Sequence, residues 1–417
     1  MDRSFFRALG PGLLFAGAAV GVSHLVQSTR AGAGYGLGLL VVVLLANIVK
    51  YPAFSFGPRY AAATGTSLLE GYRRQGRWAL ILYGVVTLAT MFTVQAAVTV
   101  VTAGLAKVTL GLTWEVLTVA EVLTAACVGL LFVGQYRVLD RVIKGVVALL
   151  TVSTVAATVM VLPRVDFSTF AVFPSGMDAK QLLFLAALVG WMPSAVDVSV
   201  WHSLWTLARR KDSGHKPTLK ESMLDFNIGY MGTALLAICF LLLGAGVVHD
   251  SGVPIAKGSV AFAAQVVGLY TSTLGEWSKP LIGGCALLVM FSTTLTVVDG
   301  FPRALSTLIG RLKGPELELA AAETSSDRAY WGALAVLAFG SLVVIGFMLK
   351  SLLSLVDLAT TLSFLTAPIL SILNHRAITS DVVPVGFRPR RGMEVYSLAG
   401  IVIQGSFAVW YLTVRFG

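Results

Sequence analysis

Long apolar runs separated by short polar segments fill the chain from about residue 10 to its end. A run of about 20 apolar residues is long enough to cross the hydrocarbon core of a bilayer as a helix. The pattern predicts eleven spans, near residues 10–29, 34–56, 78–104, 114–135, 143–163, 182–207, 226–248, 278–300, 329–349, 351–373 and 395–415. We therefore predict an all-α polytopic membrane protein with one membrane domain over residues 1–417.

The sixth run contains residues that do not suit an unbroken membrane helix. Gly190, Pro193, Ser194 and Asp197 lie together near its middle. Pro193 cannot donate a helical hydrogen bond, and it disfavours the α conformation in the residue before it. Ser194-Ala195-Val196-Asp197 matches a capping box, in which Asp197 would help to cap a second half-helix. The run therefore predicts two half-helices joined at mid-depth, where transporters place binding sites.

The first run is interrupted in a similar way. Gly17, Gly21 and the polar pair Ser23-His24 fall at mid-depth, and Ser23 is predicted to cap an outer half-helix. Two broken spans that lie five spans apart are typical of two repeats of inverted topology. We predict these repeats at about 10–163 and 182–373, with an extra helix at about 395–415.

Composition and charge agree with a membrane protein. Hydrophobic residues make up 56% of the chain and charged residues 12%. Most of the 31 lysine and arginine residues fall in alternate loops, which predicts a cytoplasmic N-terminus and an outside C-terminus. Lys50 and Arg59 are interpreted as anchors at the inner interface, and Asp299, Asp357 and His202 as solvated groups near span ends.

Several functional classes are disfavoured by the sequence. The net charge of +10 is explained by topology, so we predict no nucleic-acid partner. The three cysteines have no paired spacing, and the chain shows no phosphate-binding loop or catalytic triad. We predict a monomer in the plasma membrane (the inner membrane in a bacterium), with no cofactor and no enzymatic activity. A transporter is favoured, and an ion channel is the alternative because a polar joint also suits a pore.

Several short motifs, taken together, resemble one transporter family. They are Gly10-Pro11-Gly12, Tyr35-Gly36, Leu44-Leu45-Ala46-Asn47, Ala63-Thr64-Gly65, Met192-Pro193 and Ser292-Thr293-Thr294-Leu295-Thr296. With these motifs the chain resembles the NRAMP (natural resistance-associated macrophage protein) transporters. The resemblance implies the LeuT-type fold of inverted repeats and secondary transport by alternating access.

The chain departs from that family where the family binds its metal. The metal-binding Asp-Pro-Gly-Asn of the family falls on Gly21-Val22-Ser23-His24, and the histidine after Met-Pro falls on Ser194. Among side chains that would hold a transition metal, only Met192 remains. The resemblance predicts a divergent member without the usual metal site, whose substrate site comprises Gly21, Val22, Ser23, His24, Val189, Met192 and Ser194.

The missing aspartate changes the expected substrate. Half-helix N-termini favour negative charge, and a dehydrated divalent cation is hard to hold without a carboxylate. We therefore predict a small anion such as bicarbonate, coupled to Na⁺ or H⁺. The residues predicted to bind the coupling ion or proton are Asp197, Ser292, Thr293, Thr294 and Glu121. The alternative substrate is a divalent cation, Mg²⁺ or Mn²⁺, with Met192 and Asp197 as ligands. His24 remains either a substrate ligand or a packing residue, and Asp197 either a ligand or a helix cap.

Overall fold

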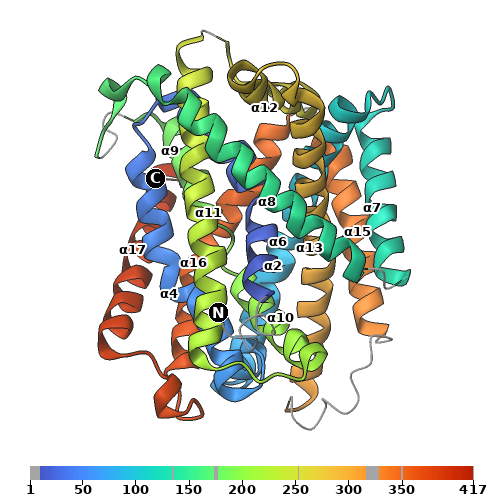
Figure 1. Cartoon of the computed structure of the whole chain (residues 1–417). Helices are drawn as coiled ribbons and strands as arrows, with labels where there is room; N and C mark the ends of the chain where they lie inside the picture. Colours follow the sequence, from blue (N-terminus) through green and yellow to red (C-terminus); the bar gives the residue numbers. More distant parts are fainter. Residues whose placement is uncertain are drawn as a thin grey trace.

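The computed structural model describes residues 10–133, 136–172, 177–251, 253–315, 328–348 and 351–416, which form a helical bundle without strands in those ranges. Eight of the described helices are long and apolar enough to span a membrane (Figure 1). They are α4 (Leu40–Thr64), α6 (Arg77–Leu110), α7 (Val116–Val133), α11 (Leu219–Val247), α13 (Ser278–Lys313), α15 (Arg328–Met348), α16 (Leu352–Ile378) and α17 (Arg391–Phe416).

The predicted break in the first span is confirmed. Helix α2 (Pro11–Ala19) is followed by a turn of π-helix, η1 (Ser23–Ser28), which continues into α3 (Thr29–Tyr35). The two parts are bent by 45° and together form a ninth candidate span. A π-helical turn inside a helix is a frequent mark of a functional site.

The predicted break in the sixth span is also confirmed. Seven residues, 191–197, separate helix α9 (Ala179–Gly190) from α10 (Val198–Ser213), and the two helices lie toward opposite ends of the bundle (Figure 1). The fifth predicted span falls on α8 (Tyr136–Val161). Neither α8 nor the α9–α10 pair amounts to a full apolar span within the described residues, so the total of eleven spans and the two repeats stay predictions.

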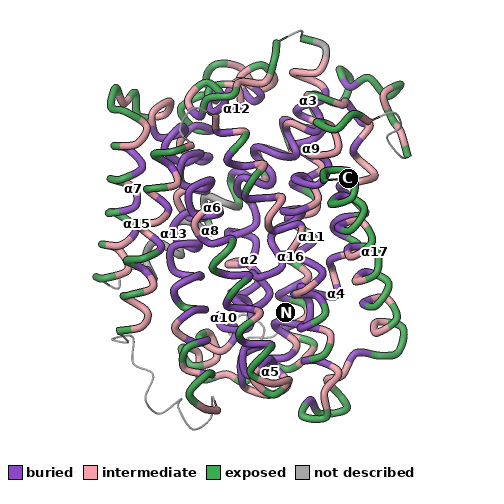
Figure 2. The backbone as a smooth tube through the Cα atoms, turned by 180° about the vertical axis from the view of Figure 1, so that it is seen from behind, coloured by how far each residue is buried: buried purple, intermediate pink, exposed green. Residues whose placement is uncertain are grey.

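Shorter elements complete the described chain. They are α5 (Leu68–Gln75), α12 (Ser259–Leu274) and single turns at Leu162–Arg164, Phe167–Thr169, His249–Ser251 and Val385–Phe387. Helix α12 lies across one end of the bundle, and α5 lies at the other end (Figures 1 and 2).

Burial separates the helices into a centre and a periphery. The most apolar stretches of α6 and α13 are 72% buried, whereas those of α7 and α15 are only 22% buried. Figure 2 shows α7, α15 and α17 at the edges of the bundle with many exposed positions. Because these exposed positions carry large apolar side chains such as Phe132, Phe339 and Val402, we infer that lipid covers this surface.

Glycines let the broken helices approach their neighbours closely. A Cβ atom built on Gly229 of α11 would lie 2.1 Å from the carbonyl oxygen of Gly12 on α2. One built on Gly190, the last residue of α9, would lie 2.0 Å from the carbonyl oxygen of Thr360 on α16. Small residues at helix crossings are a general means of close packing in membranes. They hold α2 against α11 and the end of α9 against α16.

Candidate functional site

The first break leaves main-chain carbonyls of α2 facing α13. Residues 20–22 separate α2 from η1, and the hydroxyl oxygen of Thr293 lies 2.9 Å from the carbonyl oxygen of Gly17 and 3.5 Å from that of Val20. Gly21 packs directly on the same threonine, because a Cβ atom at position 21 would lie 2.9 Å from its Cγ2. The first break therefore brings carbonyl and hydroxyl oxygens together.

The prediction that Ser23 caps the outer half-helix is wrong. Val22 stands at the cap position of η1, and no side chain caps it. The Ser23 hydroxyl oxygen lies instead 2.6 Å from the carbonyl oxygen of Ala19 and 2.7 Å from Nδ1 of His24. The hydroxyl thus donates to a carbonyl at the end of α2, four residues earlier in the chain, and not to an N–H group of η1.

The predicted capping box in the second break is also absent. Residues 191–197 are not helical, and Asp197 at the cap position of α10 makes no side-chain capping bond. The residue is only 5% exposed, and its Oδ1 atom has no hydrogen-bond partner. Because a buried carboxylate oxygen without a partner is costly, this atom is suited to receive a cation or a proton.

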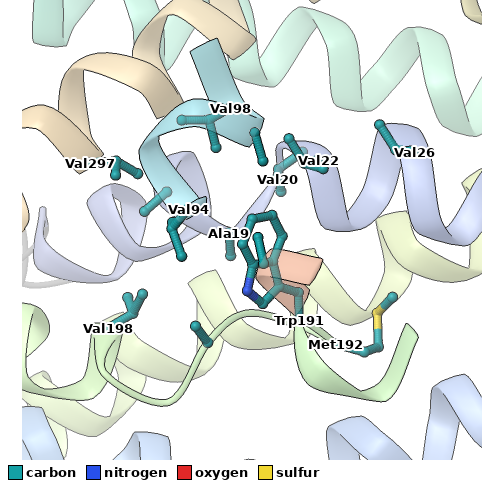
Figure 3. Packing of buried hydrophobic residues seen from close by; sticks show 14 of the residues in the cluster. Ala19, Val20, Val22, Val26, Val94, Val98, Trp191, Met192, Val198 and Val297 are labelled. Carbon is teal, nitrogen blue, oxygen red and sulfur yellow. The ribbon is translucent and has the colours of Figure 1, made fainter. Parts of the chain in front are cut away.

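A buried cavity of about 30 Å³ lies between the two breaks. The hydroxyl-bearing and acidic residues of its lining are Ser23, Ser194, Asp197 and Thr293. Trp191, Trp201 and Phe301 contribute aromatic surface, and aliphatic residues of α2, α6 and α13 complete the wall. Figure 3 shows the Trp191 ring directed toward Ala19 at the first break. The volume suits one small ion or about two water molecules.

Five of the predicted site residues line this cavity: Val22, Ser23, Ser194, Asp197 and Thr293. Gly21 is not part of the lining but touches Thr293 behind it. Val189 and Met192 also lie outside the lining, and Met192 is completely buried and set apart from the Trp191 ring (Figure 3). The side chain of Met192 therefore offers no ligand to an ion in the cavity as it stands.

His24 is directed away from the cavity. Its Nε2 atom lies 2.9 Å from the carbonyl oxygen of Thr233 on α11. A carbonyl oxygen only accepts, so Nε2 carries the proton of this hydrogen bond. The structure favours the packing role of this histidine over a role as substrate ligand.

The other predicted coupling residues are dispersed. Thr294 on α13 directs its hydroxyl to Thr102 of α6, with 2.7 Å between the two oxygens. Ser292 is buried beside Gly17, whose added Cβ would lie 3.8 Å from the serine oxygen. Glu121 is exposed on α7, at the edge of the bundle. Only Asp197 and Thr293 of this group line the cavity.

Three charged or polar groups predicted to be solvated have protein partners or are buried. Asp357 forms an ion pair with Arg30, with 2.6 Å between Oδ1 and Nη1, and so joins α3 to α16. Asp299 pairs with Arg303 at 2.7 Å and also accepts from Tyr330. His202 is buried between aromatic rings of α2 and α11 because α10 folds back into the bundle.

The most unusual residue near the site is Lys50, a buried lysine that was not among the predicted site residues. Its interpretation as an interface anchor is wrong, since the residue is 1% exposed in the middle of α4. The ammonium nitrogen donates to the carbonyl oxygens of Val189, at 2.6 Å, and Gly190, at 2.8 Å. The second span was predicted to end near residue 56, but α4 continues to Thr64, which moves Lys50 from the end of the span to its centre.

Comparison with known proteins gives a consistent result. The family model described as natural resistance-associated macrophage protein-like matches residues 12–413. An uncharacterized protein of Pasteurella multocida is 33% identical over 420 residues, covering all of this chain and 94% of that protein. The divalent metal cation transporter MntH of Verminephrobacter eiseniae is 29% identical over 268 residues, or 60% of each chain.

Solved structures share the fold at low sequence identity. A manganese transporter of Eremococcus coleocola has a TM-score of 0.74 and 12% identity, over 99% of this chain and 87% of that one. The structure of MhsT in complex with L-phenylalanine has a TM-score of 0.65 and 13% identity, over 100% and 99% of the two chains. These likenesses support the LeuT-type arrangement of the helices.

Proposed function

Because the chain belongs to the natural resistance-associated macrophage protein-like family of transporters, we propose that it carries a small inorganic ion by alternating access through the cavity between its two helix breaks. The observation that carries this proposal is the buried Asp197, whose unpartnered oxygen adjoins a cavity between two broken helices. Broken spans with free backbone groups at mid-depth are how secondary transporters build ion sites. Paired broken spans are typical of secondary transporters, which is why the channel is the weaker alternative.

The substrate that we propose is a small anion such as bicarbonate. Gly21 supplies no carboxylate, and in the described part of the chain no three His, Cys, Asp or Glu residues are grouped to hold a metal ion. Near the breaks, the formal charges are one negative on Asp197 and one positive on Lys50. A monovalent anion that enters with Na⁺ keeps this sum at zero, whereas a divalent cation raises it by two. Uncompensated charge in a low-dielectric site is costly.

The coupling cation is proposed to bind beside Thr293. The carbonyl oxygens of Gly17 and Val20 each lie within 3.5 Å of the hydroxyl oxygen of this residue, and Na⁺ favours such neutral oxygens. Turning the hydroxyl hydrogen away from the carbonyls would leave three oxygen atoms for the ion. Asp197 then either completes the cation site or carries a proton, in keeping with coupling to Na⁺ or H⁺.

The second candidate function is transport of a divalent metal cation, Mg²⁺ or Mn²⁺. What supports it are the relatives, one named a divalent metal cation transporter and another a manganese transporter. On this alternative Asp197 would be the acidic ligand, and Met192 would have to turn toward the cavity. A hydrated Mg²⁺ ion, which keeps most of its waters, needs fewer protein ligands than Mn²⁺.

A flux assay separates the two substrates. Purified protein in liposomes with an internal pH-sensitive dye is expected to alkalinise the lumen when an inward Na⁺ gradient and external bicarbonate are both present. Entering bicarbonate consumes protons, and Na⁺ supplies the driving force. Liposomes without protein control for CO₂, which crosses the bilayer unaided and acidifies the lumen. The opposite result would be no alkalinisation, together with quenching of internal calcein by external Mn²⁺ or a signal from an internal Mg²⁺ dye. In that case the substrate is the metal cation and not the anion.

Restoring the missing aspartate tests the predicted alignment. Gly21→Asp introduces a Cβ atom 2.9 Å from Cγ2 and 3.1 Å from Oγ1 of Thr293, so either this side chain or α13 must shift. We expect the single variant to be destabilised by about 1–3 kcal/mol, the usual cost of overpacking. The double variant Gly21→Asp, Thr293→Ala removes both crowding atoms and should recover most of this loss in thermal unfolding. It should also bind Mn²⁺ more tightly than the wild type in calorimetry. Equal stability of the single variant and the wild type would contradict the packing described here.

A further inference from the structure

The side chain of Lys50 reaches from α4 to the point where α9 ends. At the end of α9 the carbonyl of Val189 accepts a main-chain hydrogen bond from Met192 at 3.3 Å, and that of Gly190 would otherwise be free at the break. Both oxygens accept hydrogen bonds from the Lys50 ammonium, at 2.6 and 2.8 Å. In its ammonium form Lys50 therefore places a positive charge on the negative end of the α9 half-helix.

This ammonium has no close carboxylate partner. In the part of the chain that the structure describes, no acidic side chain lies within ion-pair distance of its nitrogen, and the acidic group that interacts with it from farther away is Asp197. Burial of an ammonium without an ion-pair partner costs several kcal/mol. A neutral donor would satisfy the same two carbonyls without that cost. A gain in folding stability therefore does not explain why a charged side chain occupies this position.

Carbonyl oxygens at the end of a half-helix are the ligands that a free cation would use in a broken span. At the α9 end, the Lys50 nitrogen already stands where such a cation would bind. The end itself is held in place, because Gly190 packs on the main chain of Thr360 with no room for a side chain. The carbonyls therefore cannot turn to another ion while Lys50 holds them.

We propose that Lys50 is the residue that determines charge selectivity, as a tethered cation that keeps free cations from the α9 carbonyls and favours a small anion in the cavity. This inference rests on the proposed anion transport and names the residue behind it. Lys50 is outside the cavity lining, so it acts through the electrostatic potential of the break and not as a direct ligand. Its positive charge balances the negative charge of Asp197. One anion and one coupling cation can therefore bind together without adding net charge.

The experiment compares two variants that separate charge from hydrogen bonding. Lys50→Gln keeps N–H donors for the carbonyls but loses the charge, and Lys50→Met loses both. Lys107→Met is the matched control, because Lys107 also donates to a main-chain carbonyl, that of Trp114, but at the end of α6 away from the cavity. Each protein is reconstituted, and bicarbonate-driven alkalinisation and Mn²⁺ uptake are measured on the same preparation, with thermal unfolding as the test of folding.

We expect the ratio of Mn²⁺ uptake to bicarbonate uptake to rise at least tenfold in Lys50→Gln and Lys50→Met and to stay unchanged in Lys107→Met. A purely structural lysine would give the opposite pattern, in which Lys50→Gln behaves as the wild type and Lys50→Met loses both fluxes together. An unchanged ratio in a folded Lys50→Gln protein overturns the assignment of Lys50 alone. A wild type that carries Mn²⁺ and not bicarbonate overturns the proposed anion transport, and the role of Lys50 with it.

Discussion

Replacing Asp197 by asparagine is expected to reduce ion uptake at least a hundredfold while the protein stays folded. The carboxylate is buried beside the cavity, and its Oδ1 atom has no protein partner. Asparagine has the same shape but neither carries a charge nor exchanges a proton. A hundredfold loss corresponds to about 2.8 kcal/mol, which is modest for a charge-assisted contact in a low-dielectric site. Uptake in liposomes against Na⁺ concentration and pH is the measurement.

The controls for this variant distinguish the acidic candidates. Glu121→Gln tests the second predicted proton carrier, and Glu276→Gln tests an exposed acid in the segment between α12 and α13. The unfolding temperature of Asp197→Asn should not fall below that of the wild type, because removing a buried charge relieves its desolvation cost. Wild-type uptake in Asp197→Asn with the same dependence on Na⁺ and pH would refute a role for Asp197 in binding or coupling.

The two breaks were predictable because they depend on local chemistry. Proline and glycine weaken a helix locally, and each break lies beside such residues, namely Gly17 and Gly21 at the first and Gly190 and Pro193 at the second. The family resemblance was likewise carried by short motifs, and the family match over residues 12–413 confirms it. Because both breaks were predicted at mid-depth, the sequence also indicated that a cavity would lie between them.

The conformation inside the breaks was less predictable. The letters Ser-x-x-Asp allow a capping box only if the chain is already helical from the serine onward. Here the chain stays non-helical up to Asp197, so the helix begins three residues later and the carboxylate is left for the cavity. Ser23 likewise turns back to Ala19 because the chain enters a π-helical turn, for which the sequence carried no clear signal.

Lys50 and His202 were misplaced for a related reason. Both were assigned to span ends from the length of the apolar run, and charged or polar side chains were assumed to seek water. Tertiary packing decides otherwise, since α4 runs past residue 56 and α10 folds into the bundle. A lysine followed by eight further uncharged residues, up to Arg59, was the signal that could have placed Lys50 inside the membrane.

Filling the cavity should stop transport without unfolding the protein. Ser194 lines the cavity from the second break and is 8% exposed. Leucine at this position would occupy the space of about 30 Å³ in which we place the ion, so we expect uptake in Ser194→Leu to fall below one hundredth of the wild type. Ser194→Ala keeps the space and removes only the hydroxyl, so it should lose about tenfold or less, the value of one hydrogen bond.

A leucine on the outside of the bundle provides the matched control. Ser153 on α8 is half-buried, away from the cavity lining, and its hydroxyl donates to the carbonyl of Leu149 on its own helix. Ser153→Leu therefore adds the same apolar volume where lipid accommodates it, and uptake should remain at the wild-type level. Substantial uptake in Ser194→Leu would place the transport path elsewhere. Loss of uptake in Ser194→Leu with a normal unfolding temperature, and not in Ser153→Leu, would support a transport path through the cavity between the breaks.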